Sequence, residues 1–161
     1  MPDEDTAARE QAQRVKAIVE KVEVFKRLSL GEAQRLLKLC SYKAYGTNEM
    51  VYRAGDASEE MLILLQGRLQ VLTEDGTVLG EILPGSVTGE MGVLTGEPRS
   101  ATILASEAAS GFVLRKSDLT TLLRDDAIRL KVMENMVGIL IERLRATNTQ
   151  LESYARKSRE M

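Results

Sequence analysis

Residues 42–114 consist of short aliphatic runs that alternate with turn sequences, and this pattern restricts the fold more than any other feature. The runs with strand character are Met50–Tyr52, Met61–Leu65, Arg68–Thr73, Thr77–Leu83, Arg99–Ala105 and Gly111–Leu114. The pair Asp75-Gly76 is the strongest hairpin signal between them. Short strands at this spacing are typical of an antiparallel sandwich or barrel. We therefore expect a mainly β fold with flanking helices (α+β), built on an antiparallel β-roll or jelly-roll sandwich.

Two helices are predicted before the strands. Apolar residues at helical spacing indicate a first helix over about residues 6–27. Ser29 and Glu32 then fit a capping box, in which each side chain accepts from a free backbone N–H group. This box predicts a second, shorter helix that ends near Leu39. The sequence leaves open whether the first helix packs on its own β domain or on another subunit.

Two further helices are predicted after the strands. Ser117 can cap a short helix, and Asp125-Asp126 begins a helix that runs to about Ser158 with no proline. The expected organisation has three parts: an N-terminal helix (1–28), a β-roll domain with short flanking helices (29–124) and a long C-terminal helix (125–161).

The last helix carries an apolar series with alternating spacings of three and four residues. Its members are Leu130, Met133, Val137, Leu140, Leu144, Thr147, Leu151 and Tyr154. More than three heptads of this pattern predict a coiled-coil seam, and hence a parallel homodimer through residues 130–154. The alternative is that the stripe packs on its own β domain, which Ile139 and Ile141 favour for the first half by widening the apolar face.

The bulk composition excludes several functions. The 161 residues have a net charge of −2 and no histidine, so neither nucleic-acid binding nor histidine-based catalysis is expected. No apolar stretch approaches membrane-spanning length, and the acidic N-terminus does not resemble a signal peptide. We therefore expect a cytoplasmic location and no membrane or metal partner. Cys40 is either a redox or nucleophilic thiol or, with no histidine to activate it, a small buried side chain.

Residues 89–102 concentrate the polar chemistry of the chain. Gly89 permits a tight backbone path, Glu90 is a carboxylate at a predicted helical turn, and Arg99 supplies a guanidinium. An anionic ligand with hydroxyl groups needs such a set, because arginine forms paired charged hydrogen bonds with phosphate while a carboxylate accepts from hydroxyls. Alternatively, Glu90 interacts only with the helix dipole and Arg99 pairs with Glu97 on a loop.

The segment from Gly89 to Thr102 resembles the phosphate-binding cassette of cyclic nucleotide-binding domains. These domains occur in protein kinase A regulatory subunits, cyclic-nucleotide-gated channels and the bacterial catabolite activator protein. The resemblance covers roughly residues 22–155. It includes Phe25–Ser29 at the entry to the β-roll, Gly55-Asp56 with the hairpin Leu62–Leu69, and Leu83–Ser86 before the cassette.

The resemblance implies a ligand, cyclic AMP or cyclic GMP, and a role for each cassette residue. Glu90 would accept from the ribose 2′-hydroxyl, and Arg99 would pair with the cyclic phosphate. The amides of Ser100 and Ala101 would complete the phosphate cradle, with Gly89 and Met91 on the ribose side. No further cofactor is implied.

The long helix resembles that of the bacterial regulators, which makes Thr147 and Asn148 candidates for base contacts at the dimer. Alternatively, these two residues are a polar break in the seam that sets its register. The chain ends seven residues after Tyr154, too few for a DNA-binding helix-turn-helix, so direct DNA binding is not expected.

The function that these features favour is a stand-alone, non-enzymatic cyclic nucleotide sensor. Ligand binding would rearrange the dimer helix, and a separate protein partner would detect the change. Thr88 departs from the family, which usually has phenylalanine before this glycine, and it keeps an alternative open: a structural dimerisation or docking module with a degenerate cassette. A third hypothesis is that the chain is a regulatory domain from a longer channel or kinase, and the sustained heptad pattern of the last helix argues against it.

Overall fold

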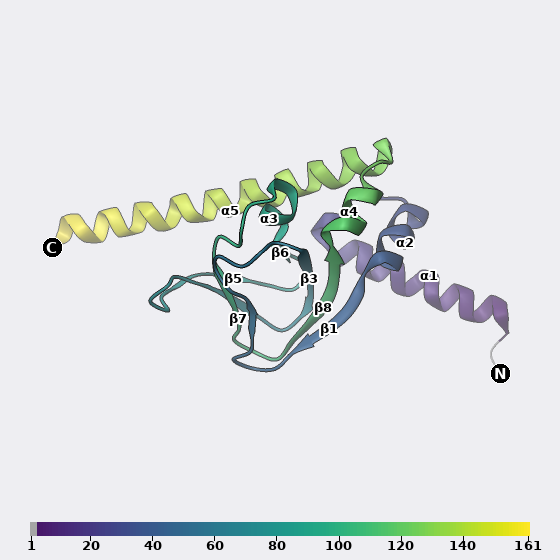
Figure 1. The fold of residues 1–161 in the computed structure, drawn as a ribbon, viewed down its shortest axis with the longest axis horizontal. Coiled ribbons are helices and arrows are strands. Elements are labelled where there is room, and N and C mark those ends of the chain that lie inside the picture. Colours follow the sequence, from purple (N-terminus) through teal and green to yellow (C-terminus); the bar gives the residue numbers. More distant parts are fainter. Residues whose placement is uncertain (1–2) are drawn as a thin grey trace.

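The computed structural model describes residues 3–161 as an eight-stranded β sandwich with helices at both chain ends (Figure 1). One antiparallel sheet has the order β1-β8-β3-β6 and the other β2-β7-β4-β5. The strands are β1 (Ser41–Tyr45), β2 (Met50–Tyr52), β3 (Glu60–Gln66), β4 (Leu69–Leu72), β5 (Val78–Ile82), β6 (Val87–Thr88), β7 (Thr102–Ala105) and β8 (Ala109–Arg115). The helices are α1 (Glu4–Lys21), the 3-10 turn η1 (Glu23–Phe25), α2 (Leu30–Leu39), α3 (Glu90–Thr95), α4 (Lys116–Leu122) and α5 (Asp126–Glu160). The expected fold class is confirmed.

Strand β3 shows where the core lies. Its residues Met61, Leu62, Ile63 and Leu64 are all fully buried. Successive side chains of a strand point to opposite faces of the sheet, so Leu62 and Leu64 pack between the sheets while Met61 and Ile63 pack with the helices. A strand covered on both faces has a continuous apolar sequence instead of an alternating one. The helices therefore cover the outer face of this sheet and form a second core with it.

Strands β1 and β6 were not predicted. Four of the five residues of β1 are exposed, and the strand is held by its pairing with β8, for example Lys43 opposite Gly111. Strand β6 has only two residues, Val87 and Thr88, which pair with Ile63 and Leu62 of β3. Neither segment has the apolar pattern that identifies a strand without its partner.

The first helix is shorter than predicted. Helix α1 ends at Lys21, and Val22 adopts an extended conformation before η1. The Glu23 amide donates to the Gly85 carbonyl at 3.0 Å, and the side chain of Phe25 is buried, so tertiary contacts divide the predicted 6–27 helix. Val15 of α1 belongs to the core cluster of the same chain. Helix α2 begins with the predicted capping box and ends at Leu39.

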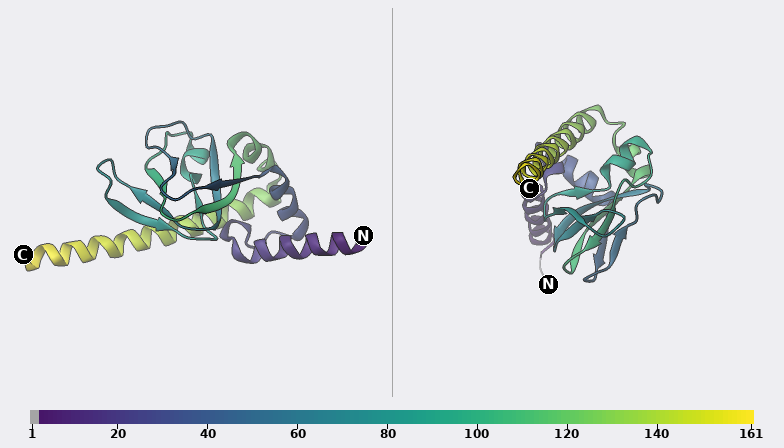
Figure 2. Two further views of the ribbon diagram at one scale, coloured as in Figure 1. Left: turned by 90° about the horizontal axis from the view of Figure 1, so that it is seen from below. Right: turned by 90° about the vertical axis from the view of Figure 1, so that its left-hand side faces the viewer.

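The C-terminal helices confirm one predicted cap and contradict the other. Helix α4 begins at Lys116 without a side-chain cap, so Ser117 lies inside it, where its carbonyl accepts from Thr121. Asp125 does cap α5 and accepts from the amides of Ala127 and Ile128. Helix α5 runs along one side of the sandwich and extends past it, so that the end of α5 and the start of α1 lie at opposite ends of the described residues (Figure 2).

Helix α5 has two apolar faces with different environments. The inward face is buried and consists of Ile128, Val132, Asn135, Met136 and Ile139. The predicted heptad series lies elsewhere: Leu130, Met133, Val137, Leu144, Thr147, Leu151 and Tyr154 are exposed, and Leu140 is half-buried. Ile139 is buried as expected, but Ile141 is exposed. The alternative that the stripe packs on its own β domain is therefore wrong for this series.

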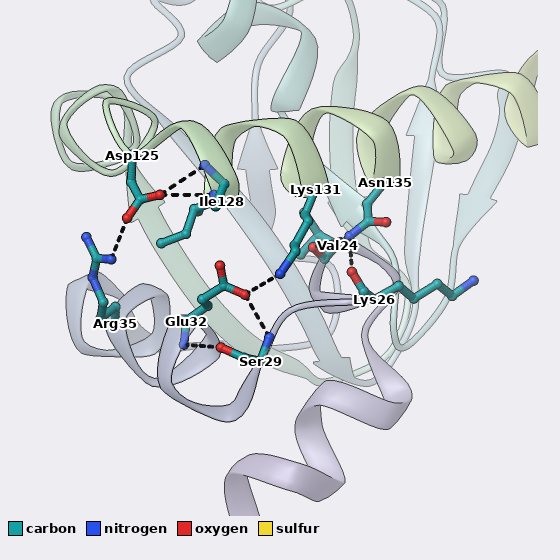
Figure 3. Close-up of polar contacts among 10 residues, drawn as sticks. Val24, Lys26, Ser29, Glu32, Arg35, Asp125, Ile128, Lys131 and Asn135 are labelled. Atoms are coloured by element: carbon teal, nitrogen blue, oxygen red, sulfur yellow. Dashed lines mark hydrogen bonds and ion pairs between the residues drawn. The ribbon is translucent and has the colours of Figure 1, made fainter.

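Polar contacts attach the N-terminal helices to the first third of α5 (Figure 3). The buried Asn135 amide donates to the carbonyls of Val24 at 3.0 Å and Lys26 at 2.6 Å. Lys131 forms an ion pair with the capping-box residue Glu32 at 2.6 Å. The Asn135 bonds satisfy a buried amide and hold α5 against η1, and the Lys131–Glu32 pair links α5 to α2. Within residues 3–161, no helix is both long and apolar enough to span a bilayer.

Candidate functional site

A cavity of about 460 Å³ lies where the predicted cassette meets β5 and the middle of α5. Its cassette lining is formed by residues 88–92 and 99–101. Across from these, α5 contributes Arg143, Ala146, Thr147 and Gln150, and β5 contributes residues 79–82. Three segments that are distant in sequence thus form one concave surface. Its volume falls in the range of sites for small molecules.

Glu90, the first residue of α3, is almost completely buried and has a charged partner. Only 1% of the residue is exposed, and its carboxylate forms an ion pair with the Arg143 guanidinium of α5. Arg143 also donates to the Ser86 hydroxyl at 3.2 Å and to the Val87 carbonyl. A buried carboxylate requires such a partner to offset its desolvation. The cassette and α5 are therefore connected at the cavity itself.

Arg99 is buried against neutral groups. Its Nη1 donates to the Gly89 carbonyl at 3.1 Å and its Nη2 to the Glu60 carbonyl at 2.5 Å. The guanidinium carbon lies 3.6 Å from the ring centroid of Tyr52. A guanidinium has five N–H groups, so these two bonds leave donor capacity for a ligand in the cavity. The alternative pairing with Glu97 is not present among the ion pairs of residues 3–161.

Gly89 allows Arg99 and Tyr52 to pack this closely. Its φ of +85° is in the left-handed region, where residues with a Cβ atom are strained. A Cβ atom at this position would lie 2.5 Å from Arg99 Nη1 and 3.0 Å from Tyr52 Cε2. Glycine is therefore needed both for the backbone turn and for the arginine.

Seven of the eight predicted site residues line this one cavity: Gly89, Glu90, Met91, Arg99, Ser100, Ala101 and Thr147. Among residues 3–161, no hydrogen-bond partner is present for the backbone amides of Ser100 and Ala101. The Thr147 hydroxyl donates to the Arg143 carbonyl at 2.9 Å. Asn148 is exposed and is not part of the lining. Thr88, where the sequence differs from the family that the cassette resembles, is buried and also lines the cavity.

Sequence reasoning did not identify Arg143, Gln150 or Tyr52 as site residues. Arg143 and Gln150 lie four residues before and three residues after Thr147, so helical periodicity places all three on one face. That spacing was available in the sequence. The sequence contains no comparable signal for Tyr52, because only the folded structure brings β2 next to the cassette.

Cys40 has the properties of a structural side chain. Burial, with a contribution from Asp118, raises the pKa of its thiol to about 12. Its sulfur donates to the Leu36 carbonyl at 3.4 Å. A protonated thiol is a poor nucleophile, which favours the packing interpretation of Cys40 over the reactive one.

Among curated proteins, this chain is similar to segments of larger proteins. Glutaminase 1 of Bradyrhizobium diazoefficiens is 28% identical over 127 residues, which are 78% of this chain and 20% of that protein. A cyclic nucleotide-gated channel of Caenorhabditis elegans is 31% identical over 112 residues, which are 65% of this chain and 15% of the channel. The chain thus spans a fifth or less of the length of these curated relatives.

The fold has a close counterpart among solved structures. The crystal structure of a cyclic nucleotide-binding domain from Methylobacillus flagellatus KT superposes with a TM-score of 0.79 at 24% identity, and covers 91% of this chain and 85% of that one. The family model for the cyclic nucleotide-binding domain matches residues 42–126, which is more than half of the 161 residues. This chain therefore belongs to the cyclic nucleotide-binding domain family.

Proposed function

We propose that this protein is a non-enzymatic sensor of cyclic AMP or cyclic GMP, and that its cavity binds the nucleotide between the cassette and α5. The observation that carries the proposal is the arrangement of Arg99 and Glu90 in one cavity. Arg99 is a buried cation with free donors, and Glu90 is a buried acceptor. A cyclic nucleotide presents an anionic phosphate and a ribose hydroxyl, which match these two groups.

The proposed binding mode assigns each part of the ligand to a wall of the cavity. Arg99 and the amides of Ser100 and Ala101 bind the phosphate. Glu90 accepts from the 2′-hydroxyl with the carboxylate oxygen that Arg143 does not use. The base extends toward Thr147 on α5. Asn148 would reach a base only from a second subunit.

The sensor function requires the ligand to bias two states of α5. A ligand that contacts both the cassette and α5 changes their relative free energy, because it binds one arrangement better than the other. The exposed heptad stripe is where we propose that two copies form a homodimer, and the rearranged helices would be detected by a separate protein partner. Hydrogen exchange tests this step: residues 139–150 are expected to gain protection when nucleotide binds.

Calorimetric titration with cyclic AMP and cyclic GMP tests the binding proposal. We expect saturable binding of at least one of them and an increase in the thermal unfolding temperature. Linear 5′-AMP is the control, because it lacks the cyclic phosphodiester that the Arg99 cradle would bind. No heat and no thermal shift at millimolar nucleotide would contradict the sensor function and favour the docking-module alternative.

A further inference from the structure

The ring of Tyr52 forms one wall of the position that Arg99 occupies. The Arg99 guanidinium carbon lies 3.6 Å from the centroid of that ring, well inside the ~6 Å limit for a cation–π contact. Each residue is only 8% exposed. Desolvation strengthens such a contact, and a planar guanidinium can stack on an aromatic face in a way that an ammonium group cannot.

The contacts of Arg99 hold it without neutralising it. Its two hydrogen bonds go to the neutral carbonyls of Gly89 and Glu60, and within residues 3–161 it forms no ion pair. Burial raises the pKa of Tyr52 well above its ordinary value, so the phenol stays uncharged. A carboxylate in the place of the ring would compete with an anionic ligand, whereas the ring leaves the positive charge of Arg99 available.

The contact between Tyr52 and Arg99 does not depend on the tyrosine hydroxyl. Within residues 3–161, the buried hydroxyls of Tyr52 and Tyr45 have no hydrogen-bond partner. An unsatisfied buried hydroxyl destabilises the folded state. The Tyr52 hydroxyl thus forms no hydrogen bond of ordinary geometry with Arg99, and the main contact is made by the ring face.

From this geometry we propose that Tyr52 is a positioning residue, whose ring orients the Arg99 guanidinium toward the phosphate of a ligand in the cavity. The inference rests on the proposed cyclic nucleotide function and adds to it a residue outside the cassette. Gly89 completes the arrangement, because a side chain there would displace Arg99 Nη1 or the Tyr52 ring. The Arg99 guanidinium is thus held by three separate segments, at Tyr52, Glu60 and Gly89.

Calorimetric titration of Tyr52→Leu and Tyr52→Phe with cyclic AMP and cyclic GMP tests this role. Loss of the ring is expected to weaken binding about 5- to 30-fold, the range of a desolvated cation–π contact. The phenylalanine variant keeps the ring and should restore affinity to within about twofold of wild type, because the ring alone makes the contact. If both variants lose affinity equally, the hydroxyl and not the ring supports nucleotide binding, and the proposal is wrong.

Tyr45→Leu is the matched control. Tyr45 belongs to the same core cluster and has the same unsatisfied hydroxyl, but it lies outside the cavity lining. Its substitution should lower the thermal unfolding temperature about as much as Tyr52→Leu and leave the nucleotide affinity unchanged. Equal affinities of the two leucine variants would contradict a specific role of Tyr52.

Side-chain NMR of arginine makes the test independent of the nucleotide. The Arg99 Nε–H resonance, assigned by comparison with Arg99→Lys, should carry a ring-current shift that Tyr52→Leu removes and Tyr52→Phe keeps. An Arg99 resonance that does not respond to Tyr52→Leu would overturn the positioning role. If the wild-type protein shows the ring-current shift but binds neither nucleotide, the proposed function is wrong. The claim that Tyr52 orients Arg99 toward a phosphate is then wrong as well.

Discussion

Glu90 and Arg143 form an ion pair across the cavity although 53 positions separate them in the chain. The Glu90 side chain is 2% exposed and that of Arg143 is 35% exposed, so the pair lies at the boundary between core and solvent. Beyond Arg143, every residue of α5 is exposed. The pair is therefore among the last contacts of α5 with its own sandwich, and it lies in the lining of the cavity.

The pair should show measurable coupling in a double-mutant cycle of Glu90→Gln and Arg143→Met. Removing Arg143 alone leaves a buried carboxylate without a countercharge, so its cost should be partly relieved when Glu90 is neutralised as well. We expect a coupling of about 1–3 kcal/mol in the free energy of unfolding, measured by urea denaturation. The exposed pair Asp126–Arg129 is the control, and its cycle should give about 0.5 kcal/mol or less. A similarly small value for Glu90 and Arg143 would mean that the pair does not hold α5.

Arg99→Ala should weaken cyclic nucleotide binding by about 1.5–3 kcal/mol, the size of a lost set of charged hydrogen bonds. Arg99→Lys keeps the charge but lacks the planar fork, so it should restore only part of the affinity. Arg129→Ala removes an exposed arginine of α5 outside the cavity and serves as the control in the same titrations. Unchanged affinity of Arg99→Ala would exclude Arg99 as the phosphate ligand.

The Glu32–Lys131 pair should make stability depend on pH. The hydrogen bond from Lys131, with that from the Ser29 amide, holds the pKa of Glu32 below its ordinary value. A lowered pKa in the folded state gives stability that is fully present above the unfolded pKa of about 4.3 and is lost as pH falls through the folded pKa. Thermal unfolding between pH 6 and pH 3 should therefore show a smaller decrease for Glu32→Gln than for wild type. Glu152→Gln, an exposed position on α5, should behave like wild type; equal pH profiles of all three proteins would contradict the role of the pair.

Cys40 should be almost inert to thiol reagents in the folded protein. With a pKa of about 12, its thiolate fraction at pH 8 is about one in ten thousand. Labelling with a disulfide reagent should be slow for the native protein and fast in urea, where the thiol returns to its ordinary pKa. Equal rates in the two conditions would show that Cys40 is accessible and reactive after all.

Sequence patterns predicted the elements whose signals are local. The capping box at Ser29 and Glu32 and the cap at Asp125 depend on side chains within one helical turn, and both form as predicted. The hairpin at Asp75-Gly76 depends on a glycine at positive φ and is also found. Where a boundary depended on tertiary contacts, as at the end of α1 near Val22, the sequence pattern extended the helix too far.

The cassette side of the site was predictable, whereas of the opposite walls only Thr147 was predicted. Gly89, Glu90 and Arg99 lie within eleven residues, so their chemistry is visible as a motif. Arg143 lines the cavity because α5 packs beside the cassette, and Tyr52 because β2 pairs with β7. Helical spacing from Thr147 could have pointed to Arg143, whereas no local spacing points to Tyr52.

The exposed stripe of α5 should be the interface of a homodimer. Leu144 is 61% exposed and Tyr154 67%, and side chains of this size at heptad spacing favour burial against a second helix. In sedimentation equilibrium we expect about twice the chain mass of 17.8 kDa for wild type and the monomer mass for Leu144→Glu, because a buried charge in the seam would have no partner. Thr149→Glu adds the same charge to an exposed position outside the series and should remain dimeric. If wild type and Leu144→Glu sediment with the same mass, this stripe is not the interface, and any effect of the ligand on α5 must act within one subunit.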